Sequence, residues 1–261
     1  MSGVMEGRLV LVTGARNKWS IAWHAATALH RQGAELAFSV YGEREEAGVS
    51  KLLAEEGIPA PIFRCNATQD GEVESLVARV AELHDGTLDG IVHAMAFANK
   101  DELSGEYVAT SKEGFAVAHE SSVYTLVSLC RYARPLLQAA NGGSIVTLSY
   151  IGAERVVPNY NVMGVAKASL EASVRYLAGD LGKDNIRVNA ISAGPIKTLA
   201  AAGIAGFDMM RKQVAEVAPL KRAVEAEEVG DAILFLLCPW SRGITGETIY
   251  VDGGYHIMGI G

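Results

Sequence analysis

Residues 149–167 read SYIGAERVVPNYNVMGVAK and connect a predicted buried strand to a predicted long helix. Pro158 favours a helix start close behind it, because proline fixes φ and lacks an amide donor that the first helical turn would leave unused. Within that helix Tyr160, Met163 and Lys167 occupy positions i, i+3 and i+7 and share one face. The phenol and the ammonium are then two turns, or about 10 Å, apart along the helix axis.

Tyr150 stands at the carboxyl end of the strand, which is where parallel α/β sheets bind their ligands. The stretch is therefore a candidate active site built from two tyrosines and a lysine. The same residues are equally compatible with a core tyrosine and a solvated lysine, so the rest of the chain decides between these two interpretations.

Short apolar runs alternate with amphipathic segments along the whole chain. The pattern predicts strands at residues 8–13, 34–41, 61–65, 90–95, 144–148, 186–191 and 248–251, and helices at residues 20–32, 43–56, 70–84, 110–138, 160–181 and 225–237. This alternation predicts an α/β fold, a Rossmann-like doubly wound parallel sheet of about seven strands with helices on both faces. Right-handed crossovers place all the carboxyl strand ends at one edge of that sheet. No linker, repeat or low-complexity tract divides residues 1–261, so we expect a single domain.

The composition narrows the function classes. Apolar residues make up 49% of the 261 residues and charged residues 20%, and the net charge is −7 without any basic block. A nucleic-acid partner would need a positive patch, so none is expected. The three cysteines, Cys65, Cys130 and Cys238, are scattered, which favours a reducing cytoplasm and predicts neither a disulfide framework nor a metal site. No apolar run approaches the ~20 residues of a membrane span, so no membrane association is expected.

Residues 13–22, TGARNKWSIA, join the first predicted strand to the first predicted helix. Backbone amides at a helix N-terminus favour phosphate, and Ser20 is placed either to cap the helix or to bind a pyrophosphate. Only Gly14 of the usual G-x-G-x-x-G pattern is present, so an ordinary strand-to-helix turn is the alternative. The position of the loop, after the first strand and before a helix, favours a dinucleotide site.

The second and third strands end in residues that bear on the choice of dinucleotide. The usual acidic residue that holds the adenosine ribose is missing after the second strand, where the chain reads Tyr41-Gly42-Glu43-Arg44. Glu43 would disfavour a 2′-phosphate and Arg44 would favour one, and we expect NADH, with NADPH as the alternative. Asn66 follows the third strand and is either an adenine contact or a turn asparagine.

Two later strand ends add candidate contacts. The fourth strand runs into Ala94, Ala96 and Ala98, whose small side chains allow close approach of a cofactor or, alternatively, tight sheet packing. After the sixth strand, residues 192–198 offer backbone groups for a nicotinamide carboxamide. Residues 194–210 are rich in glycine and alanine, and their apolar side chains predict a mobile lid over an apolar ligand or, equally, a surface helix that rests on the core.

Together these elements resemble the short-chain dehydrogenase/reductase superfamily and, within it, the divergent branch of NAD(P)H-dependent enoyl-acyl-carrier-protein reductases of bacterial type II fatty acid synthesis. Ordinary members carry Tyr-x-x-x-Lys, but here Met163 stands four residues before Lys167 and Tyr160 stands seven before it, which is the enoyl reductase spacing. The likeness covers essentially the whole chain and is closest in PNYNVMGVAKASL at residues 158–170, SAGPI at residues 192–196, and Gly253-Gly254. Asn66 and Ala94 depart from the pattern, because many relatives have Asp and Ser there, and both departures concern cofactor contacts.

The resemblance implies a dinucleotide-binding catalytic domain that transfers hydride from NADH or NADPH to C3 of a trans-2-enoyl thioester, the last step of the elongation cycle. It implies that Tyr160 stabilises or protonates the enolate, that Lys167 holds the nicotinamide ribose and favours the phenolate form of Tyr160, and that Tyr150 lines the pocket. The extra helical turn between Tyr160 and Lys167 suits a carbonyl that lies one bond beyond the reacting carbon. Expected cofactor contacts are Gly14, Ser20, Ile21, Tyr41, Asn66, Ala67, Met95, Lys167, Ile196, Lys197, Thr198, Leu199 and Ala200. Expected substrate contacts are Phe97, Ala98, Leu103, Tyr150, Tyr160, Met163, Ile204 and Phe207.

The resemblance further implies an enoyl-acyl-carrier protein as the substrate carrier and a homotetramer. The carrier is acidic, so docking needs a local basic patch; candidates are Lys197, Arg211, Lys212, Lys221 and Arg222, which are equally well explained as solvated surface charges. A carbonyl-reducing relative is a second hypothesis, which the missing Tyr-x-x-x-Lys disfavours. A non-catalytic dinucleotide-binding sensor is a third, which the retained Tyr160 and Lys167 disfavour.

Overall fold

The computed structural model describes residues 3–198 and 206–259. In that part of the chain seven strands form one parallel sheet with the order β3-β2-β1-β4-β5-β6-β7. The strands are β1 (Leu9–Thr13), β2 (Glu35–Val40), β3 (Ile62–Arg64), β4 (Gly90–His93), β5 (Gly143–Ser149), β6 (Ile186–Ala193) and β7 (Thr248–Val251). The chain first builds outward from β1 to β3 and then returns to place β4 on the other side of β1. The order therefore reverses between β1 and β4, which is where doubly wound sheets bind ligands.

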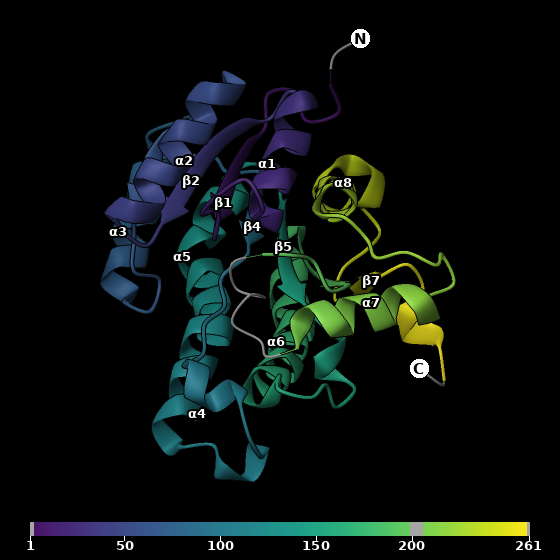
Figure 1. The fold of residues 1–261 in the computed structure, drawn as a ribbon. Coiled ribbons are helices and arrows are strands. Elements are labelled where there is room, and N and C mark those ends of the chain that lie inside the picture. Colours follow the sequence, from purple (N-terminus) through teal and green to yellow (C-terminus); the bar gives the residue numbers. More distant parts are fainter. Residues whose placement is uncertain (1–2, 199–205, 260–261) are drawn as a thin grey trace.

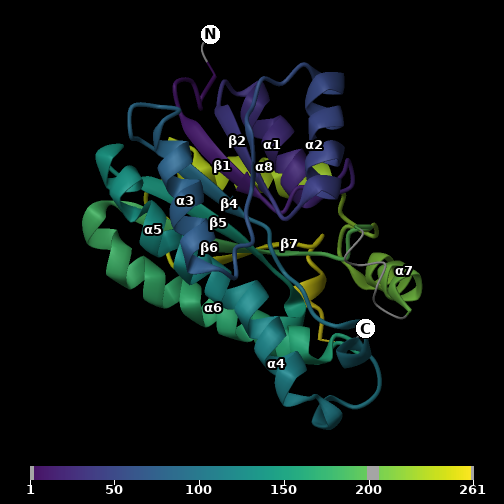
Figure 2. The same cartoon turned by 90° about the vertical axis from the view of Figure 1, so that its left-hand side faces the viewer.

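Helices cover both faces of the sheet (Figures 1 and 2). The helices are α1 (Ile21–Arg31), α2 (Glu43–Glu56), α3 (Asp70–Ala81), α4 (Lys112–His119), α5 (Thr125–Ala139), α6 (Asn161–Leu181), α7 (Phe207–Val217) and α8 (Ala226–Leu237). In Figure 2, α3, α5 and α6 lie on one side of the strands, and α1, α2 and α8 lie on the other. The helix α4 lies at the lower end of both views, and α7 lies apart from it, to the right of α6.

The core has two layers because successive strand residues point to opposite faces. In β1, Leu9 and Leu11 join the layer beneath α3, α5 and α6, whereas Val10 and Val12 join the layer beneath α1, α2 and α8. Every residue of β1 is buried. This continuous burial explains the unbroken apolar run in the sequence, which is typical of a central parallel strand that is covered on both sides.

The predicted fold class is confirmed, and several element boundaries are corrected. The fourth strand ends at His93, two residues before the predicted end, and the sixth extends two residues further, to Ala193. The helical region predicted at residues 110–138 is interrupted by a π-helical turn, Glu120–Tyr124, between α4 and α5.

The predicted loop at residues 194–210 is wrong for its last four residues, because α7 begins at Phe207. The helix buries Val214 and leaves Met209 largely exposed, so it is amphipathic and rests on the core with one side. Residues 207–210 therefore match the alternative interpretation of the segment, a surface helix that rests on the core. The remainder of the predicted lid includes residues 199–205, which lie outside the described part of the chain.

Candidate active site

The loop after β1 approaches the end of β4 so closely that only glycine fits at its start. Gly14 has φ +79°, and a Cβ atom there would lie 2.0 Å from the carbonyl oxygen of Ala94. Any side chain would therefore push the two strand ends apart, and the positive φ would add strain. The close approach of the two strand ends therefore explains why glycine occupies position 14, at the switch point of the sheet, where the predicted phosphate loop begins.

Ser20 organises that loop instead of capping the helix. Its Oγ accepts hydrogen bonds from the backbone amides of Arg16 (3.1 Å) and Asn17 (3.2 Å). It makes no side-chain cap on α1, so the predicted capping role is wrong. Because no Ser20 cap occupies the first-turn amides of α1, the helix N-terminus can accept a phosphate, and the residues present fit a pyrophosphate group.

Tyr150 and Tyr160 form an edge-to-face pair at the end of β5. Their ring centroids are 5.0 Å apart and the ring planes are 70° apart. Tyr160 is the residue that immediately precedes α6. Burial raises the pKa of Tyr150 to about 12, and burial also raises the pKa of Tyr160 well above its usual range, with a further contribution from Tyr150. The expected shift of Tyr160 toward phenolate is therefore wrong, and its phenol is a protonated hydrogen-bond donor at neutral pH.

Lys167 is buried on the face of α6 that the sequence pattern predicted. Lys167 is only 6% exposed, and its Nζ donates a hydrogen bond to the carbonyl oxygen of Leu148 at 2.7 Å. Burial lowers the pKa of Lys167 to about 8, and Glu171 opposes that shift. The interpretation of Lys167 as a solvated lysine is excluded, and the ammonium is held at the carboxyl end of β5.

Several substrate-side candidates belong to the same side of the sheet. Leu103, Ala98 and Tyr160 all pack against the core layer beneath α3, α5 and α6. Met163, which stands between Tyr160 and Lys167 in the sequence, is buried in the same layer. The ring of Phe97 is 57% exposed and is therefore available to an apolar ligand.

Met210 connects α7 to this group. The hydroxyl of Tyr150 donates to Sδ of Met210 at 3.4 Å. Phe207 is partly buried at the start of the same helix. The helix α7 therefore contacts the tyrosine pair directly, while Ile204, also an expected substrate contact, lies outside the described residues.

The π-helical turn holds the backbone of Phe97, a feature that the sequence analysis missed. The Oγ of Ser121 donates to the carbonyl oxygen of Phe97 at 3.0 Å, and the Oγ of Ser122 accepts from the amide of Phe97 at 3.2 Å. Ser122 is fully buried and also contacts Sδ of Met163 at 3.9 Å. Two adjacent serines in the middle of a helical pattern were the available signal, because serine in a helix interior often bonds to backbone groups outside the regular ladder.

The remaining cofactor candidates lie at neighbouring strand ends. Tyr41 is 72% exposed after β2, and Met95 is partly buried after β4. Asn66 uses its Oδ1 to accept from the amide (3.2 Å) and the hydroxyl (2.8 Å) of Thr68, so it forms a turn, and Ala67 beside it is buried. A contact between Asn66 and adenine stays a prediction.

Acidic residues near the predicted adenosine end are already paired. Glu43 pairs with Arg64 at 2.9 Å, and Glu45 pairs with Arg16 at 3.0 Å. Arg16 belongs to the loop after β1, so the first turn of α2 is bonded across to the predicted phosphate loop. Both pairs lie close to the predicted end of the adenosine site, at the start of α2.

Most of the predicted basic docking patch is neutralised inside the chain. Lys197 pairs with Asp208 (3.2 Å), Arg211 with Glu225 (2.9 Å) and Arg222 with Glu228 (2.7 Å), and Lys221 Nζ donates to the carbonyl oxygen of Glu216 (2.9 Å). Lys212 is exposed on α7. Ile196 is buried and Thr198 partly buried at the end of the segment after β6, whereas Leu199 and Ala200 lie outside the described residues.

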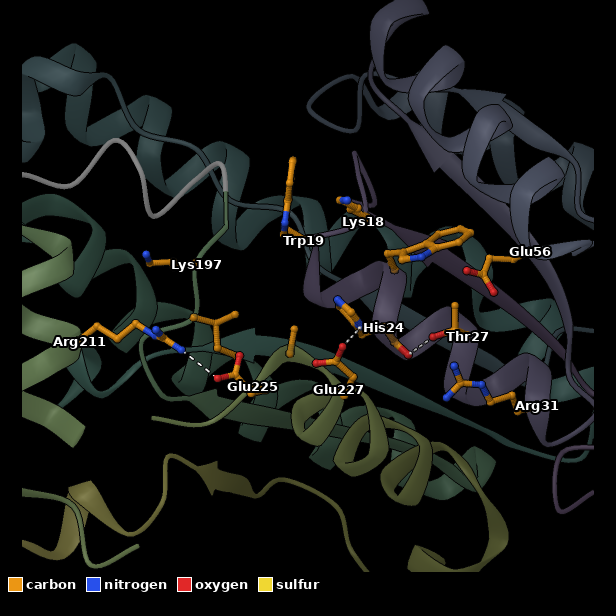
Figure 3. Close-up of a pocket in the computed structure, with 13 residues that line it drawn as sticks. Lys18, Trp19, His24, Thr27, Arg31, Glu56, Lys197, Arg211, Glu225 and Glu227 are labelled. Carbon is orange, nitrogen blue, oxygen red and sulfur yellow. Dashed lines mark hydrogen bonds and ion pairs between the residues drawn. The ribbon is translucent and has the colours of Figure 1, made fainter. Parts of the chain in front are cut away.

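A cavity of about 600 Å³ lies between α1, the segment after β6, and the start of α8 (Figure 3). Its walls are Lys18, Trp19, Trp23, His24, Thr27, Arg31, Glu56, Ile196, Lys197, Arg211, Glu225, Ala226 and Glu227. Side chains of its wall pair with one another, Arg211 with Glu225 at 2.9 Å and His24 with Glu227 at 3.4 Å. Lys18 and Trp19 come from the predicted phosphate loop, so the cavity borders the dinucleotide site and does not contain the tyrosine pair.

The described part of the chain contains no group of three metal-ligating side chains. Nor does a search of the same residues find a helix with the length and hydropathy to cross a membrane.

The reversed sheet order, the loop after β1, Tyr160 immediately before α6 and the buried Lys167 on α6 define a short-chain dehydrogenase/reductase. Within this class, the sequence model described as "Enoyl-(Acyl carrier protein) reductase" matches residues 14–256, and the chain belongs to that family. The Bacillus subtilis enoyl-acyl-carrier-protein reductase (NADH) FabI is 52% identical over 258 residues, which are 98% of this chain and 99% of the relative.

Solved structures agree with this assignment. The Bacillus cereus enoyl-acyl-carrier-protein reductase, crystallised with NADP+ and indole naphthyridinone, superposes with a TM-score of 0.95 at 47% identity and covers 99% of this chain and 100% of that one. The Anaplasma phagocytophilum enzyme, crystallised with NAD, has a TM-score of 0.94 at 45% identity and covers 100% of this chain and 98% of that one.

Proposed function

We propose that the protein is an NAD(P)H-dependent enoyl-acyl-carrier-protein reductase that saturates the C2–C3 double bond of a trans-2-enoyl thioester. The observation that carries the proposal is Tyr160, packed on Tyr150 at the carboxyl end of β5, together with the buried Lys167 seven residues later. Family membership and the NADH named for the Bacillus subtilis relative support NADH as the cofactor, with NADPH as the alternative.

When bound, the reduced nicotinamide supplies the hydride that C3 of the thioester receives. Negative charge then develops on the thioester oxygen, and a fixed donor at that oxygen lowers the barrier. Tyr160 is the candidate donor, because its raised pKa keeps the phenol protonated. Tyr150 packs on its edge and fixes the ring, and Lys167 holds the nicotinamide ribose through an ammonium that is anchored on Leu148.

The acyl chain is proposed to lie between Phe97 and the start of α7, and the part of residues 194–210 that precedes α7 is the proposed lid. The contact between Tyr150 and Met210 supports this placement, because it couples α7 to the tyrosine pair. The exposed Phe97 ring supplies apolar surface on the opposite side.

An acyl-carrier protein is the proposed donor of substrate, and the cytoplasm is the proposed compartment. A homotetramer is proposed as the assembly. Exposed aromatic side chains on two helical segments, Tyr176 at 80% and Trp240 at 66%, support burial of these surfaces between subunits. Sedimentation equilibrium measures the assembled mass, and a monomer at micromolar concentration would contradict the tetramer.

One assay tests the activity. NADH oxidation is followed by absorbance with crotonyl thioester, with a ketone, and with neither. Oxidation with the thioester is expected. Oxidation only with the ketone would instead establish a carbonyl reductase, and NADH binding without turnover would establish a sensor.

Two variants test the residue roles. Tyr160→Phe is expected to lose rate far more than NADH affinity, whereas Lys167→Ala is expected to lose both. Tyr132→Phe, a matched loss of one phenol hydroxyl on α5, is the control and should retain full activity. An unchanged rate for Tyr160→Phe would contradict the role of Tyr160.

A further inference from the structure

Glu171 carries a buried carboxyl group to which the proposed reaction assigns no role. It is 7% exposed, and its Oε1 accepts a hydrogen bond from the hydroxyl of Ser149. An acidic side chain is seldom buried unless it is paired or has a function, because desolvation penalises its charge. It follows Lys167 by four residues on α6, so it lies on the same helix face, about 6 Å further along the axis.

Two consecutive residues at the end of β5 hold both charged groups. The carbonyl oxygen of Leu148 accepts from Lys167 Nζ, and the hydroxyl of Ser149 donates to Glu171. Ser149 is itself buried and paired with Ser192 of β6, so the donor is fixed by the sheet. The strand end therefore sets the separation between the ammonium and the carboxylate.

Several other charged or titratable groups act on this pair. Burial raises the pKa of Glu171, and the hydrogen bond from Ser149 opposes that shift. Arg175, one turn beyond Glu171 on α6, and Lys167 also favour the ionised carboxylate. Glu154 acts in the opposite direction and is hydrogen-bonded by the hydroxyl of Tyr250 on β7. On the other side His93, buried and neutral, lies near Lys167. Among these groups, Glu171 is the one that favours the charged form of Lys167.

We propose that Glu171, anchored by Ser149, is a positioning residue that keeps Lys167 positively charged in its buried site. This inference rests on the proposed function, in which Lys167 holds the nicotinamide ribose. Without the carboxylate, burial alone would act on the ammonium, and the lysine would lose its proton at a lower pH. NADH would then be held by a neutral amine near neutral pH.

The test uses Glu171→Gln, which keeps the shape and the hydrogen-bonding capacity of the side chain and removes its charge. The pH at which Lys167 loses its proton is read in the full-length, cofactor-free protein from the ¹³Cε resonance of labelled lysine, assigned with Lys167→Met. We expect this titration, near pH 8 in the parent protein, to move down by about one unit or more. Asp180→Asn removes a carboxylate from an exposed position of the same helix and should leave the titration unchanged.

NADH affinity, measured by fluorescence titration between pH 6 and pH 9, is the second readout. In Glu171→Gln the affinity should match the parent at pH 6 and fall about fivefold below it at pH 8, where a one-unit shift leaves about a tenth of the variant's lysine protonated against half of the parent's. The two affinities should converge again once both lysines are neutral. Ser149→Ala, which frees the carboxylate without removing its charge, should give a smaller displacement of the same sign.

A purely structural role gives a different pattern. If Glu171 only fills space, Glu171→Gln lowers stability or weakens NADH binding equally at all pH values, and the Lys167 titration does not move; that result overturns the inference. If instead Lys167→Ala binds NADH as tightly as the parent, the proposed role of Lys167 fails, while the resonance titration still reports whether Glu171 controls its charge.

Discussion

Replacing Lys167 by methionine should make the protein more stable while abolishing its function. Lys167 is only 6% exposed, and burial of its ammonium lowers the pKa from 10.5 to about 8. At about 1.4 kcal/mol per pKa unit, this displacement costs the folded state roughly 3 kcal/mol at neutral pH. Methionine fills similar space without a charge. It leaves the carbonyl oxygen of Leu148 without its donor, which costs about 1 to 2 kcal/mol. The expected net gain of Lys167→Met is therefore about 1 to 2 kcal/mol at pH 7.

The gain should depend on pH in a direction that the structure fixes. The folded-state pKa of Lys167 lies below the unfolded-state value, so between pH 8 and pH 10.5 the unfolded chain binds more protons than the folded one. The penalty is fully present below pH 8 and disappears as the pH rises toward 10.5. The parent protein therefore recovers stability over this window, and the difference between the two proteins narrows.

Urea unfolding of both proteins without cofactor, at the same protein concentration and at pH 7 and pH 9.5, measures that difference. NADH binding by fluorescence confirms the loss of function. If Lys167→Met is less stable than the parent at pH 7, or if the difference is the same at both pH values, burial does not penalise the ammonium in the way the structure indicates.

Three further predictions test other parts of the site. Gly14→Ala should weaken NADH binding about tenfold or more and lower the melting temperature, because its Cβ has no room beside the end of β4; unchanged affinity would contradict this account. Ser122→Ala removes a buried acceptor for the Phe97 amide and should lower kcat/KM for crotonyl thioester about tenfold with little change in the NADH dissociation constant, consistent with the loss of one buried hydrogen bond; equal losses of both would instead indicate general unfolding of the loop. Glu45→Gln frees Arg16, an exposed partner at 3.0 Å, and should raise the NADPH/NADH ratio of kcat/KM about two- to fivefold, which is the range of an exposed ion pair; a constant ratio would exclude Arg16 as a 2′-phosphate contact.

The strands of the sheet were predictable because buried strands appear in the sequence as continuous apolar runs. The run at residues 8–13 leaves little choice, since all five residues of β1 are covered on both faces. The end of β4 was harder, because the residues after His93 remain apolar although the strand has ended. The His93 ring is fixed by the hydroxyls of Thr147 (2.8 Å) and Thr125 (2.9 Å), and these partners are distant in sequence.

The placement of Met163 and Lys167 on one face of α6 was also predictable from helical periodicity, whereas Tyr160 precedes the helix, whose first residue, Asn161, has φ +39°. What the sequence could not supply was the environment of that face. The expectation for Tyr160 considered the charge of Lys167 and neglected burial, which acts in the opposite direction and prevails. The π-helical turn was missed for a related reason, because its serines bond to Phe97, which no periodic pattern connects to them.

The directions of these pKa shifts indicate different roles for Tyr160 and Lys167. A phenol whose pKa is raised by burial gives up its proton reluctantly, so on the proposed function Tyr160 contributes a strong hydrogen bond to the developing oxyanion more readily than a full proton transfer. An ammonium whose pKa is lowered to about 8 is the group that titrates near physiological pH. The pH dependence of the enzyme above neutrality therefore belongs to Lys167, and through it to Glu171, even though the tyrosine faces the reacting thioester. The seven-residue spacing of the phenol and the ammonium makes this division possible, because it lets Tyr160 pack on Tyr150 while the buried Lys167 is anchored on β5.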